Sequence, residues 1–455
     1  MGENILKKIP YGISDYKTIV EKNYLFVDKT KHIELFEGLG EPFVFFLRPR
    51  RFGKSLFVSI LEYYYDVNYE EDFDKLFGNT YIGKNCTDEK NSYHVLKFNF
   101  SGINTSNKDK LLEGFTTNVL NGLKAFEKKY KLNIQYKTTG MPSEIFSTFL
   151  VEAAEQIEGQ LYVLIDEYDH FANELLSFQS DVFEETISRT GFVRKWYEIL
   201  KSGTDNGFIQ RIFATGVSPI TLDSLTSGFN IGKNKTMDIR FNECLGFTQD
   251  EVENVLRESL GNAIDIEKEM PVLKKYYNGY LFNKNAKKRI FNSDMVLYYA
   301  SEYSATNMPP EQLIDTNVSS DYKKIASLFT IKNKEQNFKI LKEIIEGVSQ
   351  KTLITAEFSL AKKFTRDDFN SLLFYLGFLT IDKPDLNEAD LIVPNYVVKE
   401  LYFDFFGEVL GEEAGYDIDV NEIRSSIRDI AKYADVKSFI QIVTTTLNKL
   451  SNRDF

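Results

Sequence analysis

The sequence contains few of the residues that build disulfide-linked or metal-centred proteins. Its 455 residues include two cysteines, Cys86 and Cys244, and three histidines, His32, His94 and His170. Two cysteines provide no disulfide framework, and no histidine lies close enough to a second histidine or a cysteine to indicate a zinc site. We therefore expect a protein of a reducing compartment, and the composition argues against zinc or histidine-based catalysis.

Long apolar runs are also absent. No stretch approaches the roughly 18 apolar residues that a membrane-spanning helix needs, and residues 1–16 (MGENILKKIPYGISDY) lack the apolar core of a signal peptide. The net charge of −12 and the isoelectric point near 5.1 argue against a chain covered with positive charge for general nucleic-acid binding. We expect a soluble cytoplasmic protein with no membrane partner, while a local basic patch stays open.

Apolar strand-like runs alternate with helix-like segments over the first 248 residues. We expect strands at 43–47, 93–101, 161–165, 208–220 and 236–248, and helices at 28–39, 53–65, 110–130, 143–157 and 192–203. Continuous apolar strands that alternate with helices predict a mostly parallel sheet covered on both faces. The predicted fold class is therefore α/β, and a length of 455 residues predicts two or three domains.

The sequence pattern changes after residue 248. Residues 249–350 predict a helical, lid-like subdomain whose first helix is capped by Thr248. Residues 351–410 contain a predicted helix, two strands around a polar turn and another helix, an order that is compatible with a winged-helix fold. Residues 411–455 predict a helical tail. The expected division is thus 1–248, 249–350, 351–410 and 411–455.

The end of the first predicted strand carries a candidate phosphate-binding loop, RPRRFGKS at residues 48–55. Such a loop needs a tight turn, backbone N–H groups that converge on phosphates, and a helix N-terminus behind them. Gly53 allows close approach of the phosphates, Lys54 would reach the β- and γ-phosphates, and Ser55 would place its hydroxyl on Mg²⁺. Arg48 departs from the G-x-x-x-x-G-K-[ST] pattern because it replaces the first glycine, and Pro49 would set the bend through its fixed φ.

The loop predicts most of the nucleotide contacts. Its anion-facing amides are expected to run from Arg51 to Ser55. The predicted nucleotide-binding residues of the loop are Arg51, Phe52, Gly53, Lys54, Ser55 and Leu56. Arg50 and Arg51 would contact the nucleotide, pair with acidic neighbours or point to solvent.

Polar residues at the ends of two later strands complete the candidate site. Asp166 ends a buried strand (LYVLIDE, 161–167) and would hold the Mg²⁺ shell, while Glu167 would polarise the attacking water. Thr215, at the end of FIQRIFAT, would sense the γ-phosphate. Asp169 is expected to be a helix cap or a structural partner, and not a ligand. The candidate arginine fingers, which no pattern distinguishes, are Arg194, Arg211 and Arg240.

Several motifs together resemble one bacterial AAA-ATPase-like family. The loop R-P-R-R-F-G-K-S-L is that family's signature. The family's other motifs occur in the expected order along the chain, at residues 12–30 before the loop and at residues 163–169, 214–231, 245–252 and 276–282 after it. The resemblance covers about residues 8–400 and implies a P-loop NTPase core of the additional-strand type that binds ATP and Mg²⁺. It also implies that Tyr24 and Asp28, in the lead-in segment, line the adenine pocket.

The same resemblance implies an effector. Members of the family often continue into a nuclease-like domain of the PD-(D/E)XK type, which needs an acidic residue followed on a strand by (D/E)-x-K. We find no convincing copy of that arrangement before Phe455, so we assign no nuclease activity and expect the domain to be lost, split off or truncated. A nuclease domain or another protein effector is the expected partner, and an oligomer stays open.

Three functional hypotheses follow. The first is a Mg²⁺-dependent ATPase that drives or gates an effector with a DNA-related or defence role, with Lys54, Glu167 and Thr215 as its catalytic residues. The second is a slow nucleotide-gated switch with little turnover. The third is DNA binding through the winged segment, but that segment carries more acids than bases, which disfavours phosphate binding.

Overall fold

A five-stranded parallel sheet forms the core of the first of two units, residues 1–398 and 399–455. The protein is represented by a computed structural model, which describes residues 6–172, 191–219, 231–315, 328–329, 334–356, 364–385, 387–414 and 435–451, with a few positions between 422 and 429. Within these residues, no helix is long and apolar enough to cross a lipid bilayer.

The strand order of the sheet is β2-β3-β4-β1-β5, and all neighbours run parallel. The strands are β1 (Phe43–Leu47), β2 (Tyr93–Asn99), β3 (Gln160–Asp166), β4 (Ile209–Gly216) and β5 (Lys233–Asn234). An additional strand, β4, therefore separates β1 from β3, as the family resemblance implied. The predictions of an α/β fold and of a parallel sheet are confirmed.

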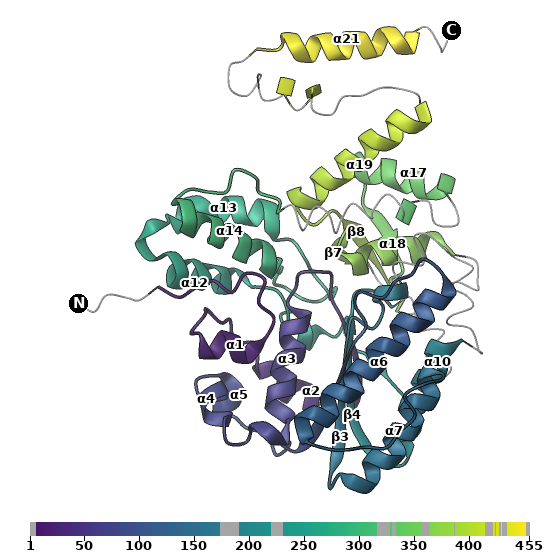
Figure 1. Ribbon diagram of the computed structural model, residues 1–455. Coiled ribbons are helices and arrows are strands. Elements are labelled where there is room, and N and C mark those ends of the chain that lie inside the picture. Colours follow the sequence, from purple (N-terminus) through teal and green to yellow (C-terminus); the bar gives the residue numbers. More distant parts are fainter. Residues whose placement is uncertain are drawn as a thin grey trace. The chain divides into compact units, whose positions relative to one another are not determined.

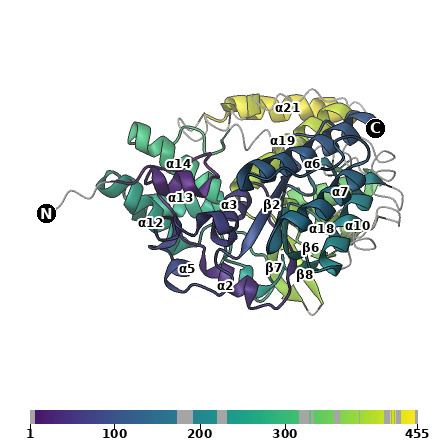
Figure 2. The same cartoon turned by 60° about the horizontal axis from the view of Figure 1, so that its bottom comes forward.

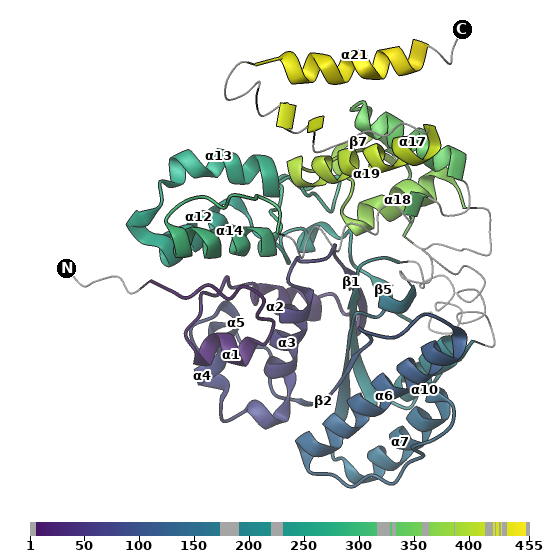
Figure 3. The same cartoon turned by 45° about the horizontal axis from the view of Figure 1, so that its top comes forward.

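Helices cover both faces of this sheet, which explains the continuous burial of its strands. Helices α2 (Lys31–Glu37) and α3 (Lys54–Tyr65) lie on one side, and α6 (Lys108–Tyr130), α7 (Pro142–Gln156) and α10 (Phe192–Asp205) lie on the other (Figure 3). Strand β2 runs between α3 and α6 (Figure 2). Short helices α1 (Tyr16–Glu21), α4 (Phe73–Phe77) and α5 (Tyr81–Lys84) and the 3₁₀ turn η1 (Val67–Tyr69) complete the first half.

The prediction of a strand at 236–248 is wrong. The edge strand is the shorter β5, and the segment after it forms a 3₁₀ turn, η2 (Ile239–Phe241). The Asp238 carboxylate accepts a hydrogen bond from the Arg240 N–H at 3.0 Å, and such a local bond favours a turn over an extended strand. The Phe241 ring stacks on Phe36 with centroids 4.0 Å apart, so the segment buries its apolar residues without joining the sheet.

A helical bundle follows the sheet in the chain. It contains α12 (Gln249–Leu260), the 3₁₀ turn η3 (Gly261–Ala263), α13 (Ile266–Tyr277) and α14 (Ser293–Thr306), and α14 packs against both other helices (Figure 1). Thr248 caps α12 as predicted: its hydroxyl accepts from the Glu251 N–H, and the Glu251 carboxylate accepts from the Thr248 N–H.

The last part of the first unit is a small antiparallel sheet with its helices. Strands β6 (Gln350–Thr352), β7 (Thr380–Asp385) and β8 (Glu388–Ile392) pair in the order β6-β8-β7, and α17 (Lys334–Ile345) and α18 (Arg366–Leu376) precede and interrupt them. The predicted order of helix, two strands and helix is confirmed, and β6 was not predicted. Helix α19 (Tyr396–Ala414) leads into the second unit, which contains α21 (Lys437–Ser451).

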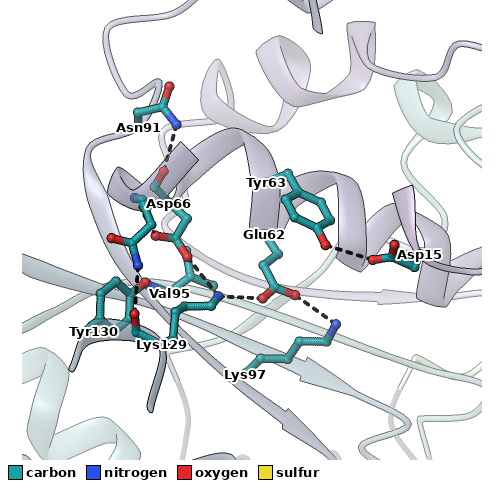
Figure 4. Close-up of polar contacts among 10 residues, drawn as sticks. Asp15, Glu62, Tyr63, Asp66, Asn91, Val95, Lys97, Lys129 and Tyr130 are labelled. Atoms are coloured by element: carbon teal, nitrogen blue, oxygen red, sulfur yellow. Dashed lines mark hydrogen bonds and ion pairs between the residues drawn. The ribbon is translucent and has the colours of Figure 1, made fainter. Parts of the chain in front are cut away.

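Helix α3 is tied to β2 and α6 by charged side chains. Glu62 on α3 accepts from Lys97 of β2 at 2.9 Å and from Lys129 of α6 at 2.6 Å, and Lys129 also binds the buried Asp66 at 2.8 Å (Figure 4). Burial alone would raise the pKa of Glu62, but the two ammonium groups hold it below its ordinary value of 4.5. These contacts fix the helix that begins directly at the candidate phosphate loop.

We expect Glu62→Gln to destabilise the protein at pH 7 by about 3 kcal/mol, because it leaves two partly buried cations short of a negative partner. Since folding lowers the pKa of Glu62, its contribution is present above pH 4.5 and is lost as the pH falls through the lower folded value. Urea unfolding followed by the fluorescence of Trp196, the single tryptophan, measures both effects.

The matched control is Glu113→Gln, because Glu113 pairs with Lys110 on an exposed face and should change stability by less than about 0.5 kcal/mol. An equal loss for the two variants, or a Glu62→Gln effect that does not shrink at low pH, would contradict the assigned role of Glu62.

Candidate functional site

The turn between β1 and α3 exposes the start of a helix to a cavity. Arg51 and Gly53 adopt left-handed backbone conformations, with φ of 69° and 90°. A side chain rarely tolerates the second value, which explains the glycine. No side chain caps the N-terminus of α3 within the described residues, so the first N–H groups of the helix remain available to an anion.

The cavity has a volume of about 470 Å³, within the usual range for small-molecule sites. One group of lining residues is polar and comes from the loop, from the ends of β2 and β3 and from the turn after β3. A second group is apolar and comes from the N-terminal segment. The polar group includes Lys54, Ser55, Asn99, Ser101, Glu167 and His170, and the apolar group includes Pro10, Ile13, Ile19, Leu25, Phe26 and Val27.

Lys54 is buried beside the acids. Its Nζ donates to the carbonyl oxygen of Pro49 at 3.1 Å, and its side chain is 5% exposed. Burial lowers the pKa of Lys54, while the negative charges of Glu167 and Asp166 oppose that shift. The ammonium group therefore lies at the base of the loop with a neutral carbonyl as its hydrogen-bond acceptor, which an anionic ligand could replace.

Ser55, at the start of α3, acts on Asp166 at the end of β3. Burial raises the pKa of Asp166 and the charge of Glu167 raises it further, while the nearby Ser55 side chain lowers it. A hydroxyl and a carboxylate are hard oxygen ligands of the kind that Mg²⁺ prefers. No cluster of three or more acidic, histidine or cysteine ligands occurs in the described part of the chain.

Glu167 lines the cavity from a strained backbone position. Its φ is 55°, a value that non-glycine residues rarely adopt, and its N–H donates to Asp166 Oδ1 at 3.0 Å. Such a conformation persists only where its surroundings enforce it.

The residues after Glu167 enforce that conformation. The Asp169 carboxylate accepts from the N–H groups of Val217 and Ser218 at 3.0 and 2.6 Å, so Asp169 is a structural partner as expected. The Tyr168 N–H donates to the Thr215 carbonyl at 3.1 Å. Together these bonds join the turn after β3 to the end of β4 and fix the direction of Glu167.

Four of the predicted site residues lie outside the lining of the cavity: Asp166, described above, and Thr215, Asp28 and Tyr24. The Thr215 hydroxyl is buried and donates to the Phe46 carbonyl at 2.7 Å. Asp28 accepts from the Thr30 N–H at 2.8 Å and from the Tyr81 N–H at 2.6 Å. Tyr24 is adjacent in sequence to the lining residues Leu25, Phe26 and Val27. The functional roles of Thr215, Tyr24 and Asp28 stay predictions.

Arg48 points away from the cavity into the protein. Its guanidinium donates to the carbonyl oxygens of Leu47, Thr236 and Phe241 at 2.6–2.8 Å and lies between the rings of Phe46 and Phe282. Burial lowers the pKa of Arg48 to about 9, so it is still charged at neutral pH. The residue that replaces the first glycine is thus a structural bridge from β1 to the segment after β5.

The three predicted arginine fingers also lie elsewhere. Arg194 pairs with Glu198, Arg211 pairs with Glu89, and Arg240 pairs with Asp238. None of the three lines the cavity, whereas Arg50 and Arg51 do.

The sequence analysis missed several lining residues. Asn99 is the last residue of β2 and pairs in register with Asp166, so its position at the carboxyl end of a buried parallel strand was the available signal. Ser293 and Asp294 come from α14, more than 230 residues after the loop, and no local pattern indicates their approach. His170 was noted only as one of the three histidines of the chain.

The comparisons with known proteins agree with this geometry. Residues 10–226 match the model of a family described as "Predicted AAA-ATPase". These residues belong to this AAA-ATPase-like family. The matched region contains β1 to β4, the phosphate loop, Asp166 and Glu167, and it begins at Pro10, the first lining residue of the cavity.

One curated relative is described as "Uncharacterized protein in vnfD 5'region" from Azotobacter chroococcum mcd 1. It is 27% identical over 283 residues, which are 60% of this chain and 48% of the relative. The chain therefore spans about half the length of that relative.

We expect Arg48→Lys to destabilise the protein by about 3 kcal/mol, because one ammonium group cannot reach the three carbonyl oxygens that the planar guanidinium binds. Arg240→Lys is the control, since Arg240 is exposed and should tolerate the change within about 0.5 kcal/mol. Urea unfolding followed by Trp196 fluorescence compares the two. Equal stability of Arg48→Lys and wild type would show that Arg48 does not bridge these segments.

Proposed function

We propose that this protein is a Mg²⁺-dependent ATPase in which the phosphate loop, β3 and the N-terminal segment together bind ATP. One observation carries the proposal. Lys54, Ser55 and Glu167 line a single cavity, and the Asp166 carboxylate accepts a hydrogen bond from the N–H of Glu167 at 3.0 Å. Because these groups come from two strands separated by β4, their convergence depends on the parallel sheet and not on proximity in sequence.

The loop would bind the phosphates through its amides. The first N–H groups of α3 and the backbone from Arg51 to Leu56 provide donors, and the positive end of the helix dipole attracts negative charge. Lys54 would exchange the Pro49 carbonyl for a phosphate oxygen, which supplies the anionic partner that its buried charge requires.

Ser55 and Asp166 would hold Mg²⁺ when it is bound with the nucleotide. The ion would neutralise charge on the β- and γ-phosphates. Glu167 would orient the attacking water and accept its proton, a role that suits a carboxylate fixed by the turn after β3. We propose that Thr215 connects the end of β4 to the part of the site that binds the phosphates.

The apolar N-terminal segment would bind the base. Leu25, Phe26 and Val27 line the cavity, while Asp28 fixes the following turn through Thr30 and Tyr81. We therefore propose that Tyr24 and Asp28 position the base-binding residues between them.

The helical bundle would act as a lid over the nucleotide. Arg51 pairs with Asp294 of α14 at 3.3 Å, and the Ser293 hydroxyl and the Asp294 N–H both donate to the Arg51 carbonyl, at 3.2 and 3.3 Å. The phosphate loop therefore touches the lid directly. Phosphates that attract Arg51 would weaken its bond to Asp294, and this exchange would move α14.

The small antiparallel sheet would carry the response to an effector. A Cβ on Gly377, which ends α18, would lie 2.8 Å from Pro49 of the phosphate loop, so loop and sheet are in close contact. We propose that this winged-helix-like segment docks a protein effector, such as a nuclease-like domain with a DNA-related or defence role. Asp382 and its acidic neighbours on β7 and β8 do not favour direct DNA binding.

A slow nucleotide-gated switch is the second candidate. It is favoured by one observation, that Arg194, Arg211 and Arg240 are not among the described residues that line the cavity, because an arginine finger can raise the rate of phosphoryl transfer by about 10³-fold or more. In this version a partner would supply an arginine finger.

Lys54→Ala should weaken Mg²⁺–ATP binding at least about tenfold, since it removes a charge-assisted bond to phosphate. Glu167→Gln should keep binding and lower phosphate release by about 10²-fold or more. Calorimetry measures the first effect, and a phosphate-release assay measures the second.

Glu113→Gln, on an exposed helix face, serves as the control for both. Wild-type protein that takes up no ATP or GTP would exclude the proposed function. If wild type and Glu167→Gln bind ATP but release phosphate equally slowly, the protein is a switch.

Asp294→Asn should raise nucleotide affinity by about threefold, because Arg51 then loses a partly exposed competitor of the phosphates. Glu302→Gln, an exposed acid on the same helix, should leave the affinity unchanged. Weaker binding by Asp294→Asn alone would mean that Asp294 contacts the nucleotide itself and does not compete with it.

A further inference from the structure

The three histidines of the chain have different surroundings. His32 is buried, its Nδ1 lies 3.0 Å from the Lys29 carbonyl oxygen, and burial lowers its pKa to about 3, so it is a neutral structural residue. His94 lies on β2 with its ring 4.7 Å from that of Tyr130. His170 instead lines the same cavity as Lys54 and Glu167.

His170 also has a polar atom that the protein leaves unsatisfied. Its Nδ1 is buried and has no hydrogen-bond partner within the described part of the chain. Buried polar atoms without a partner are uncommon in folded proteins, because leaving one unpaired costs about 1–3 kcal/mol. His170 therefore combines a buried, unpaired imidazole nitrogen with a place in the cavity lining, and this points to a ligand that completes the hydrogen bonding of its ring.

The backbone around His170 is held firmly. Its N–H donates to the Glu167 carbonyl at 3.1 Å, and Tyr168 and Asp169 between them are bonded to the end of β4. The histidine thus keeps a fixed position relative to Glu167. Its ring retains rotational freedom, since the χ2 torsion of histidine has a broad energy profile that lets either nitrogen turn toward a neighbouring oxygen.

We propose that the imidazole of His170 donates a hydrogen bond to the terminal phosphate of the bound nucleoside triphosphate and so distinguishes the triphosphate from the diphosphate. The proposal rests on the proposed function. Glu167, which would act on the water beside the terminal phosphate, and Lys54, which would bind the β- and γ-phosphates, line the same cavity. His170 lines that cavity as well.

The experiment compares affinities for a non-hydrolysable ATP analogue and for ADP, each with Mg²⁺, by calorimetry on the full chain. His170→Ala should weaken binding of the triphosphate analogue about tenfold, as expected for a lost hydrogen bond to a charged group, and should change ADP affinity less than twofold. His170→Asn should restore part of the difference, because its amide nitrogen lies near the position of Nδ1. His94→Ala is the matched control and should change neither affinity.

The ratio of the two affinities separates a phosphate contact from a structural role. Equal losses for the triphosphate analogue and ADP, or no loss for either, would overturn the role of His170 while leaving the proposed function intact. Wild-type protein that binds neither nucleotide would overturn both. Trp196 fluorescence of each variant shows whether it is folded before binding is measured.

Discussion

The guanidinium of Arg48 joins the phosphate loop to the rest of the first unit. Its bonds to three carbonyl oxygens hold the end of β1 against the segment after β5, and Phe282, from the stretch between α13 and α14, lies against its face. A buried cation of this kind is tolerated only while every acceptor stays in place. The loop is therefore shaped by a contact on its far side, and this frees the near side, with Gly53 and the start of α3, for a ligand.

Charge balance explains the arrangement on the near side. Lys54 follows β1, whereas Asp166 and Glu167 lie at the end of β3, and their charges partly compensate one another in a buried setting, as the opposing effects on the pKa values of Lys54 and Asp166 show. The Mg²⁺–ATP ligand of the proposed function would add both negative and positive charge to this group.

Residues outside the AAA-ATPase-like region also contact the loop of the candidate site. Asp294 of the helical bundle contacts the loop at Arg51, and Gly377, at the end of α18, lies close to Pro49. Both neighbours lie beyond residue 226, where the family match ends. A change in the loop would therefore also affect the helical bundle and the end of α18, because both make their contacts with the loop residues themselves.

By itself the sequence determined the strands that are buried on both faces and the helices between them. It also singled out Gly53, Lys54, Ser55, Asp166 and Glu167 as candidate site residues. Local patterns along the chain encode each of these features. The strand predicted at 236–248 failed because a local bond from Asp238 and the packing of Phe241 outweigh its apolar composition. Only the tertiary structure decided that Arg48 is a bridge, that Asp294 reaches the loop and that His170 lines the cavity. Each of these depends on segments that are distant in sequence, and no spacing along the chain records which distant groups meet.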